Sequence, residues 1–281
     1  MSEKLVTDKD YADFYQSGWN AQKSQRQDYF STQAAVALET RSIFPDFVVF
    51  EDEDLLIVNK PAGLNTHRTD MQHLGILEIA QDYHGGIDLF AVNRLDNVTS
   101  GATVLAKNKD SYNALREQFG NKDQPDMRKM YVALLDGHVS DTKPAEITTY
   151  IAPTNTKPFK MKVVKPSHPN AKDAVTQFTP LALYQDPDTQ ALFTLTQARI
   201  FTGRTHQIRI SAAQALAPTI RGISGDPLYN PESQTTPRCM LHSYEVDFRH
   251  PRTQKLHKII AYPTDDFLYQ FEGLRLLRRF V

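Results

Sequence analysis

One carboxylate lies in a stretch of short polar residues that suits a turn and could also present an acid to a cleft. The stretch is Arg94-Leu95-Asp96-Asn97-Val98-Thr99-Ser100-Gly101. Short polar side chains bond neighbouring backbone amides, so the pattern taken alone favours an ordinary turn. An Asp at a strand end could equally be presented to a cleft, with the neighbouring Arg94 facing substrate phosphate.

A second candidate is a tyrosine at the start of an apolar strand, in the segment Arg128-Lys129-Met130-Tyr131. A tyrosine at such a position usually buries its ring in the core and satisfies its hydroxyl with a hydrogen bond. Taken alone, Tyr131 therefore indicates a half-buried core residue.

The third candidate stretch is Phe201-Thr202-Gly203-Arg204-Thr205-His206-Gln207-Ile208-Arg209-Ile210, which follows a predicted strand and runs into a predicted helix. Gly203 allows a tight backbone turn, and Thr205 suits the N-cap of the helix. Arg204 is able to make a two-pronged pair with a carboxylate or phosphate, which a lysine cannot reproduce. A structural ion pair beside a capped helix is the alternative interpretation.

Two further junctions, at Gly225-Asp226-Pro227 and Leu241-His242-Ser243, show no decisive chemistry of their own.

The elements that must position these residues are mainly short strands. Apolar runs predict strands at 47–50, 55–58, 90–92, 102–106, 130–135, 145–150, 174–184, 191–200, 241–248 and 257–262. Helical spacing predicts helices at 74–84, 108–119, 205–216 and 265–272. Many strands with few helices, and no regular alternation of the two, predict an α+β fold with a mixed, mainly antiparallel sheet and flanking helices.

The chain divides near residue 45. Residues 1–44 are polar, with apolar residues only loosely spaced for a helix, and we expect an extension wrapped on the main domain at 45–281. The 281 residues suffice for one large domain, and an apolar content of 40% excludes wholesale disorder.

Several classes of protein are excluded by composition. No apolar run approaches the ~20 residues that cross a bilayer, and the polar N-terminus predicts neither a secretory signal nor a transit peptide. The single Cys239 excludes an internal disulfide and a zinc site built from several thiolates. No glycine-rich phosphate loop is present. We therefore expect a cytoplasmic protein.

The charge is unevenly distributed. Residues 1–54 hold 5 Lys/Arg against 11 Asp/Glu, whereas the remainder holds 27 against 22. Residues 157–172 hold five lysines and no acid, among them Lys160, Lys162 and Lys165. Such a stretch is more often a solvated surface, but it also suits a loop that follows RNA phosphates.

In the order of its motifs, the chain resembles the RluA-type family of pseudouridine synthases, which modify ribosomal and transfer RNA. The resemblance covers roughly residues 47–263. It rests on Val58-Asn59-Lys60-Pro61-Ala62-Gly63, Arg94-Leu95-Asp96 with Thr99-Ser100-Gly101, Lys129-Met130-Tyr131, Thr202-Gly203-Arg204-Thr205-His206-Gln207-Ile208-Arg209, Gly225-Asp226 and Leu241-His242. Each motif alone is weak, whereas the ordered series is specific.

The resemblance implies a catalytic domain with a central RNA-binding cleft, and a reaction that needs no metal and no nucleotide cofactor, in agreement with the absent motifs. Asp96 is then the nucleophile or base, Arg204 pairs with it and keeps it ionised, and Tyr131 stacks against the uracil. Arg94 helps to hold the RNA distorted. The remaining expected RNA contacts are Lys129, His206, Arg209, Lys160, Lys162 and Lys165. The expected partner is structured rRNA or tRNA, and the expected state is a monomer with no obligatory protein partner and no membrane association.

Two departures from the family pattern remain. The family usually has His before Arg-Leu-Asp, where this chain has Asn93. Residues 1–44 lack the basic character of the S4-like domain that many members carry, so we expect that domain to be absent. Two rival hypotheses stay open: a catalytically silent RNA-binding protein on the same fold, and a glycosidic hydrolase with paired carboxylates. The second would need another acid, and Asp226 is the nearest candidate.

Overall fold

The computed structural model describes residues 33–68, 74–121, 123–139, 141, 143–156, 159–233 and 236–280. Most of the expected N-terminal extension therefore lies outside the described residues, and the absence of an S4-like domain stays a prediction. The described end of the extension is helix α2 (Gln33–Ser42), whose Ala37 packs in one cluster with Phe44, Val58 and Ile76.

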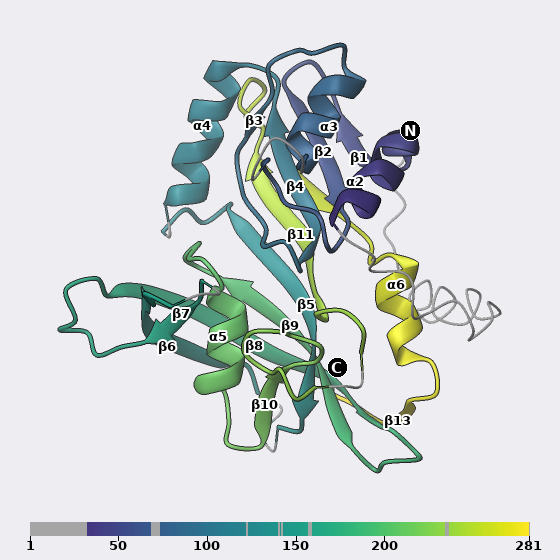
Figure 1. The fold of residues 1–281 in the computed structure, drawn as a ribbon. Helices are drawn as coiled ribbons and strands as arrows, with labels where there is room; N and C mark the ends of the chain where they lie inside the picture. Colours follow the sequence, from purple (N-terminus) through teal and green to yellow (C-terminus); the bar gives the residue numbers. More distant parts are fainter. Residues whose placement is uncertain are drawn as a thin grey trace.

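The described residues form one mixed sheet of thirteen strands (Figure 1). Its main path runs β1-β2-β4-β11-β5-β9-β8-β6-β7, and β3, β10, β12 and β13 attach to β4, β5, β11 and β8. Within this sheet β4 and β11 pair in parallel, and the other pairs are antiparallel. The strands are β1 Val48–Glu51, β2 Leu55–Lys60, β3 Phe90–Ala91, β4 Ser100–Ala106, β5 Arg128–Gly137, β6 Ala145–Pro153, β7 Met161–Val163, β8 Lys172–Gln185, β9 Leu192–Ile200, β10 Ile220–Ile223, β11 Leu241–Arg249, β12 Leu256–Ile260 and β13 Arg275–Arg279.

The helices cover different parts of this sheet. They are α3 (Ile76–Tyr83), α4 (Lys109–Gly120), α5 (Gln207–Gln214) and α6 (Asp265–Leu268), with 3-10 turns η2 (Phe44–Phe47) and η3 (Tyr269–Phe271). In Figure 1, α2, α3 and α4 surround the part of the sheet that holds β1 to β4, and α5 lies in front of β8 and β9. None of the helices in the described part of the chain is both long and apolar enough to span a membrane.

The first four residues of strand β2 are all apolar because both faces of the strand are covered there. Leu55 and Ile57 belong to the cluster under α4, whereas Leu56 and Val58 belong to the cluster under α2 and α3. Successive side chains of a strand point to opposite faces, so the part of β2 that is covered on both faces, its first four residues, is apolar at each position.

Strand β8 shows the opposite pattern. Its residues alternate between buried and half-buried over most of its length, with Ala174, Thr176 and Phe178 on the buried face. A period of two is typical of a strand with one face on the core and one toward solvent.

The expected α+β class, with a mixed and mainly antiparallel sheet, is confirmed. Each strand predicted from the sequence is present, and the predicted helix at 265–272 is the short α6 followed by η3. Strands β7, β10 and β13 were not predicted. Strand β13 is exposed at every position, so no alternating apolar pattern marks it.

Candidate active site

The loop that carries Asp96 connects β3 to β4 and is fixed by its own backbone. The Thr99 amide donates to the Asp96 carbonyl (3.0 Å), which closes a turn. Thr66 makes two hydrogen bonds with Leu95, the residue before Asp96. The Thr66 hydroxyl accepts from the Leu95 amide (3.0 Å) and donates to the Leu95 carbonyl (3.1 Å). The turn inferred from the short polar residues is therefore present, and it holds Asp96 at the edge of a pocket.

The turn after β2 is hydrogen-bonded to the same loop. The Gly63 amide donates to the Asn97 carbonyl (2.8 Å), and the Asn97 side chain donates to the Gly63 carbonyl (2.9 Å). Lys60 is fully buried there, and its Nζ donates to the carbonyls of Pro61 (2.9 Å) and Leu64 (2.6 Å). Burial lowers the pKa of Lys60 to about 7, helped by the positive charge of Arg238.

Asn93, the residue that departs from the family pattern, has a structural role. Its Nδ2 donates to the Ala102 carbonyl (3.1 Å), and its Oδ1 accepts from the Val104 amide (2.7 Å). The side-chain amide thus pairs with β4 as a strand backbone would, just where β3 ends. Asn93 therefore anchors the start of the Asp96 loop.

Arg209 is the arginine that pairs with Asp96. Its Nη1 donates to Asp96 Oδ2 at 3.0 Å, while Nε and Nη2 donate to the two oxygens of Asp226 at 2.7 and 2.8 Å. Arg209 is 2% and Asp226 1% exposed. Although burial opposes the charged form, the two carboxylates raise the pKa of Arg209. One buried guanidinium thus joins the Asp96 loop to the loop after β10.

The expected pairing of Arg204 with Asp96 is wrong. Arg204 Nη2 donates to Asp173 Oδ1 (2.8 Å), and its Nε donates to the Asp173 carbonyl (2.9 Å). Arg204 precedes α5 and lines the rim of the pocket, whereas Arg209 lies in the first turn of α5 and is buried. The expectation that Arg209 contacts RNA phosphate is also corrected, because two carboxylates occupy its buried guanidinium.

His206 forms the N-cap of α5 in a left-handed conformation, with φ of 57°. The expected Thr205 cap is therefore wrong; the turn places the cap one residue later. His206 Nε2 lies 3.9 Å from Asp96 Oδ2, and Nδ1 lies 2.9 Å from the Tyr229 hydroxyl. Burial lowers the pKa of His206, and the Asp96 charge opposes this. A non-glycine residue in this conformation costs conformational free energy, and residues of this kind are concentrated at functional sites.

Tyr131 lines the same pocket from β5 and is 8% exposed. Burial raises the pKa of Tyr131 to about 12, and a hydrogen bond to Ser243 opposes the shift. Its hydroxyl therefore stays protonated near neutral pH and is available as a donor. The pocket is lined by Arg94, Leu95, Asp96, Thr99, Tyr131, Ile200, Arg204, His206, Gln207, Ile208, Arg209 and Leu241.

The other predicted RNA contacts lie in different settings. Arg94 is exposed at its rim. Lys129 turns inward: its Nζ donates to the Phe119 carbonyl (3.2 Å), and burial with the charge of Arg204 lowers its pKa to about 8. The exposed side chains of Lys160, Lys162 and Lys165 lie in and after the connection between β6 and β7.

A buried network under the pocket was not identified from the sequence. Arg238 Nη2 donates to Ser100 Oγ (2.7 Å), and His242 Nδ1 lies 2.8 Å from the same oxygen. His242 Nε2 is 2.8 Å from the Ala261 carbonyl, which only accepts, so Nε2 carries the proton and Nδ1 accepts from Ser100. Burial lowers the pKa of His242 to about 4. The pair sits where β4 and β11 align in parallel, His242 opposite Ser100, and no sequence spacing marks it.

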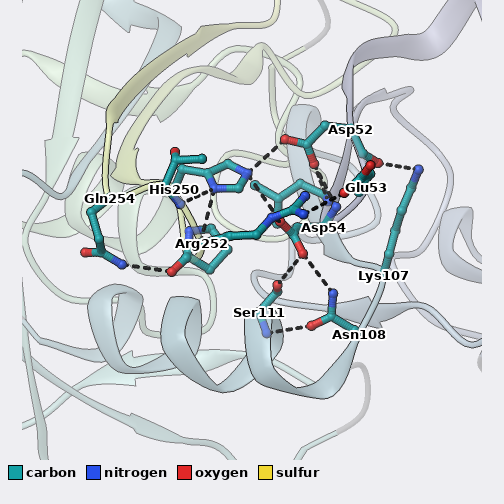
Figure 2. Close-up of polar contacts among 12 residues, drawn as sticks. Asp52, Glu53, Asp54, Lys107, Asn108, Ser111, His250, Arg252 and Gln254 are labelled. Atoms are coloured by element: carbon teal, nitrogen blue, oxygen red, sulfur yellow. Dashed lines mark hydrogen bonds and ion pairs between the residues drawn. The ribbon is translucent and has the colours of Figure 1, made fainter.

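A second polar cluster, at the turn between β1 and β2, offers ligand types that a metal could use. Asp52, Asp54 and His250 place one ligand atom each within 4.8 Å of one another. Figure 2 shows that these atoms are engaged: His250 Nε2 faces Asp52 Oδ2 (2.8 Å), and Arg252 Nε donates to Asp54 Oδ2 (2.7 Å). Asn108 also donates to Asp54 (3.1 Å). The cluster joins the β1–β2 turn to α4 and to the β11–β12 turn as an ion-pair network.

Comparison with known proteins places this site in a family. Residues 54–214 match the RNA pseudouridylate synthase family. An uncharacterized RNA pseudouridine synthase of Bacillus subtilis is 32% identical over 227 residues, covering 78% of this chain and 70% of the relative. A Helicobacter pylori protein of the same description is 33% identical over 229 residues, covering 74% of this chain and 63% of the relative. The ribosomal large subunit pseudouridine synthase C of Buchnera aphidicola is 30% identical over 239 residues, with 82% and 71% coverage.

Solved structures support the fold. Human RNA pseudouridylate synthase domain containing 4 superimposes with a TM-score of 0.66 at 21% identity, covering 87% of this chain and 98% of that one. Human RNA pseudouridylate synthase domain containing 1 gives a TM-score of 0.62 at 22% identity, with 83% and 89% coverage. The motifs, the sheet and these matches confirm the expectation from the sequence: the chain belongs to the RluA-type family of RNA pseudouridine synthases, which are isomerases.

Proposed function

We propose that this protein isomerises specific uridines of ribosomal or transfer RNA to pseudouridine, with Asp96 as nucleophile or base and without a cofactor. The observation that carries the proposal is the hydrogen bond between Arg209 and Asp96, at a pocket that Tyr131 also lines. A carboxylate held by a buried guanidinium at the end of a fixed turn is oriented before substrate arrives.

The reaction needs bond breaking and bond making but no net redox change. The N1–C1′ bond of uridine breaks, the uracil turns over, and C5 joins C1′, while C5 loses a proton and N1 gains one. The target nucleotide must leave its stack to enter the pocket, at a cost of a few kcal/mol. Asp96 is positioned to add to the base, to attack C1′, or to take a ribose proton, and the proposal holds for each route.

The neighbouring side chains take separate roles in this proposal. Tyr131 packs against the uracil, and its neutral hydroxyl relays the proton from C5 by accepting it on oxygen while passing on its own. Arg209 orients Asp96, which is the role first expected of Arg204. Arg204, paired with Asp173 at the pocket rim, holds the RNA near the target nucleotide.

The RNA-binding surface is proposed to surround the pocket. Arg94 is exposed at the rim and inserts toward the RNA, His206 lines the pocket, and Lys129 lies close enough to Arg204 for their charges to interact. The exposed lysines Lys160, Lys162 and Lys165 contact phosphates, which fix register without reading sequence. We further propose that the protein acts in the cytoplasm as a monomer. That the Buchnera aphidicola relative is named for the large ribosomal subunit favours rRNA among the candidate substrates.

Both rival hypotheses are weaker once the contacts are known. Asn93, which motivated a catalytically silent protein, anchors the Asp96 loop through two hydrogen bonds to β4. A hydrolase would need Asp226 as its second acid. Burial favours protonation of Asp226, but the pair with Arg209 and two backbone amides lower its pKa, so it does not serve as a proton donor.

The test is a map of pseudouridines in total RNA from cells with and without this protein. We expect one or a few positions to lose pseudouridine in the deletion strain. Wild-type protein should restore them, and the Asp96→Asn variant at the same expression level should not. Identical maps in the two strains, or full restoration by Asp96→Asn, would contradict the proposal.

A further inference from the structure

The connection between β6 and β7 reaches the edge of the Asp96 pocket. The Met161 amide donates to the Tyr229 hydroxyl at 2.7 Å, and the same hydroxyl lies 2.9 Å from His206 Nδ1. The ring of Phe159 lies 6.0 Å from the His206 ring at an interplanar angle of 68°. Because His206 is 3.9 Å from Asp96, Phe159 is separated from the carboxylate by a single side chain.

Phe159 is exposed, although the backbone beside it is fixed. The residue is 54% exposed, whereas Met161 is 7% exposed and packs with Ile151, Ala174 and Ile210. A Phe side chain that packs fully removes a large apolar area from water, so exposing one beside a pocket leaves a flat apolar surface available to a ligand. The Thr154 amide donates to the Lys160 carbonyl (2.9 Å). This hydrogen bond ties the residue that follows Phe159 to the end of β6.

The charges on either side indicate which kind of ligand fits that ring. Lys160 and Lys162 are both exposed and flank the buried Met161. An aromatic ring with adjacent lysines suits a single-stranded nucleic acid, because the base stacks on the ring while its phosphates meet the ammonium groups.

We propose that Phe159 forms a stacking subsite for an unpaired nucleobase next to the target nucleotide. The inference rests on the proposed function and adds to it a second point of contact with the RNA. The base beside the flipped uridine has lost a stacking neighbour, and the Phe159 ring replaces it. Stacking on an aromatic ring tolerates any base, so the subsite holds the RNA open near the pocket without selecting sequence.

The experiment compares two probes of equal charge by fluorescence anisotropy: a labelled uridylate dodecamer and an abasic ribose-phosphate dodecamer. Phe159→Ala should weaken binding of the uridylate probe by about fivefold or more, as expected for one lost stack, and leave binding of the abasic probe unchanged. Phe159→Trp should retain wild-type binding of both. The matched control is Leu256→Ala, because Leu256 is also 54% exposed but lies on β12.

Two results would overturn the subsite. One is a wild-type protein that does not distinguish the two probes, and the other is a Phe159→Ala variant that keeps the preference for uridylate. The assay needs no turnover, so it is independent of the pseudouridine map: activity without the stacking signature rejects the subsite alone, and the signature without activity rejects the proposed function alone. Circular dichroism verifies that the variants are folded.

Discussion

Asp96 accepts a 3.0 Å hydrogen bond from Arg209, a residue 113 positions away in the chain. The same guanidinium holds both oxygens of the buried Asp226. Arg209 therefore has no freedom to swing away, and the Asp96 carboxylate is held at a fixed position in the pocket. The Asp96 loop and the start of α5 are coupled through this one side chain.

Changing Asp96 to Asn should abolish pseudouridine formation while leaving the fold and RNA binding largely intact. The amide is nearly the same size and still accepts the bond from Arg209, but it cannot act as nucleophile or base. Single-turnover assays on RNA from the deletion strain measure the loss, and filter binding measures the affinity. Near-normal turnover in the variant would remove Asp96 from its assigned role.

Changing Arg204 or Arg209 to lysine should affect different kinetic constants. Arg209→Lys keeps the charge but loses the fork that holds two carboxylates, so kcat should fall on the order of 100-fold. Arg204→Lys should raise KM and leave kcat within about threefold, since Arg204 is paired with Asp173 at the rim. Steady-state kinetics on the same RNA measures both. A larger kcat effect at Arg204 than at Arg209 would restore the assignment expected from the sequence.

Changing Tyr131 to Phe should lower kcat on the order of 100-fold with little change in KM. The ring proposed to pack against the base remains, and only the hydroxyl proposed to assist proton transfer is lost. Because burial raises the pKa of Tyr131 to about 12, the wild-type rate should show no ionisation of this group between about pH 6 and pH 9. A Tyr131→Phe enzyme with wild-type kcat would limit Tyr131 to stacking.

Replacing Asn93 by Ala should destabilise the protein by about 1–3 kcal/mol. The Val104 amide and the Ala102 carbonyl would each lose their partner at the edge of the loop. Urea denaturation measures the change in the free energy of unfolding, with the exposed Asn155→Ala as the control. Equal stability of the two variants would show that Asn93 does not anchor the loop.

Acidification should destabilise the protein through His242. In the unfolded chain this histidine takes up a proton near pH 6.5, whereas in the fold it stays neutral until about pH 4. Between these values the unfolded state binds more protons, so stability falls as the pH falls, by about 3 kcal/mol from this group. Unfolding free energies at about pH 7.5 and pH 4.5 measure the loss. His242→Gln, which cannot titrate, should lose less over the same interval; an equal loss in both proteins would exclude His242 as the cause.

The sequence by itself determined the fold class and singled out the residues to which the chemistry is assigned in the proposed function. The apolar run of β2 and the alternation of β8 follow from which strand faces are buried, a local pattern that any single chain displays. The Asp96 segment and Tyr131 were identified because their motifs occur in a fixed order. Both residues line one pocket in the structure.

The tertiary structure alone decided which arginine serves Asp96. Arg204 and Arg209 lie in one motif, and either side chain is chemically suited to a carboxylate. The left-handed turn at His206 and the packing of α5 against the sheet point residue 209 inward and leave residue 204 at the rim. The pairs Ser100–His242 and Asn93–Val104 were likewise decided by strand register, because contacts across a sheet depend on how distant segments align and not on spacing along the chain.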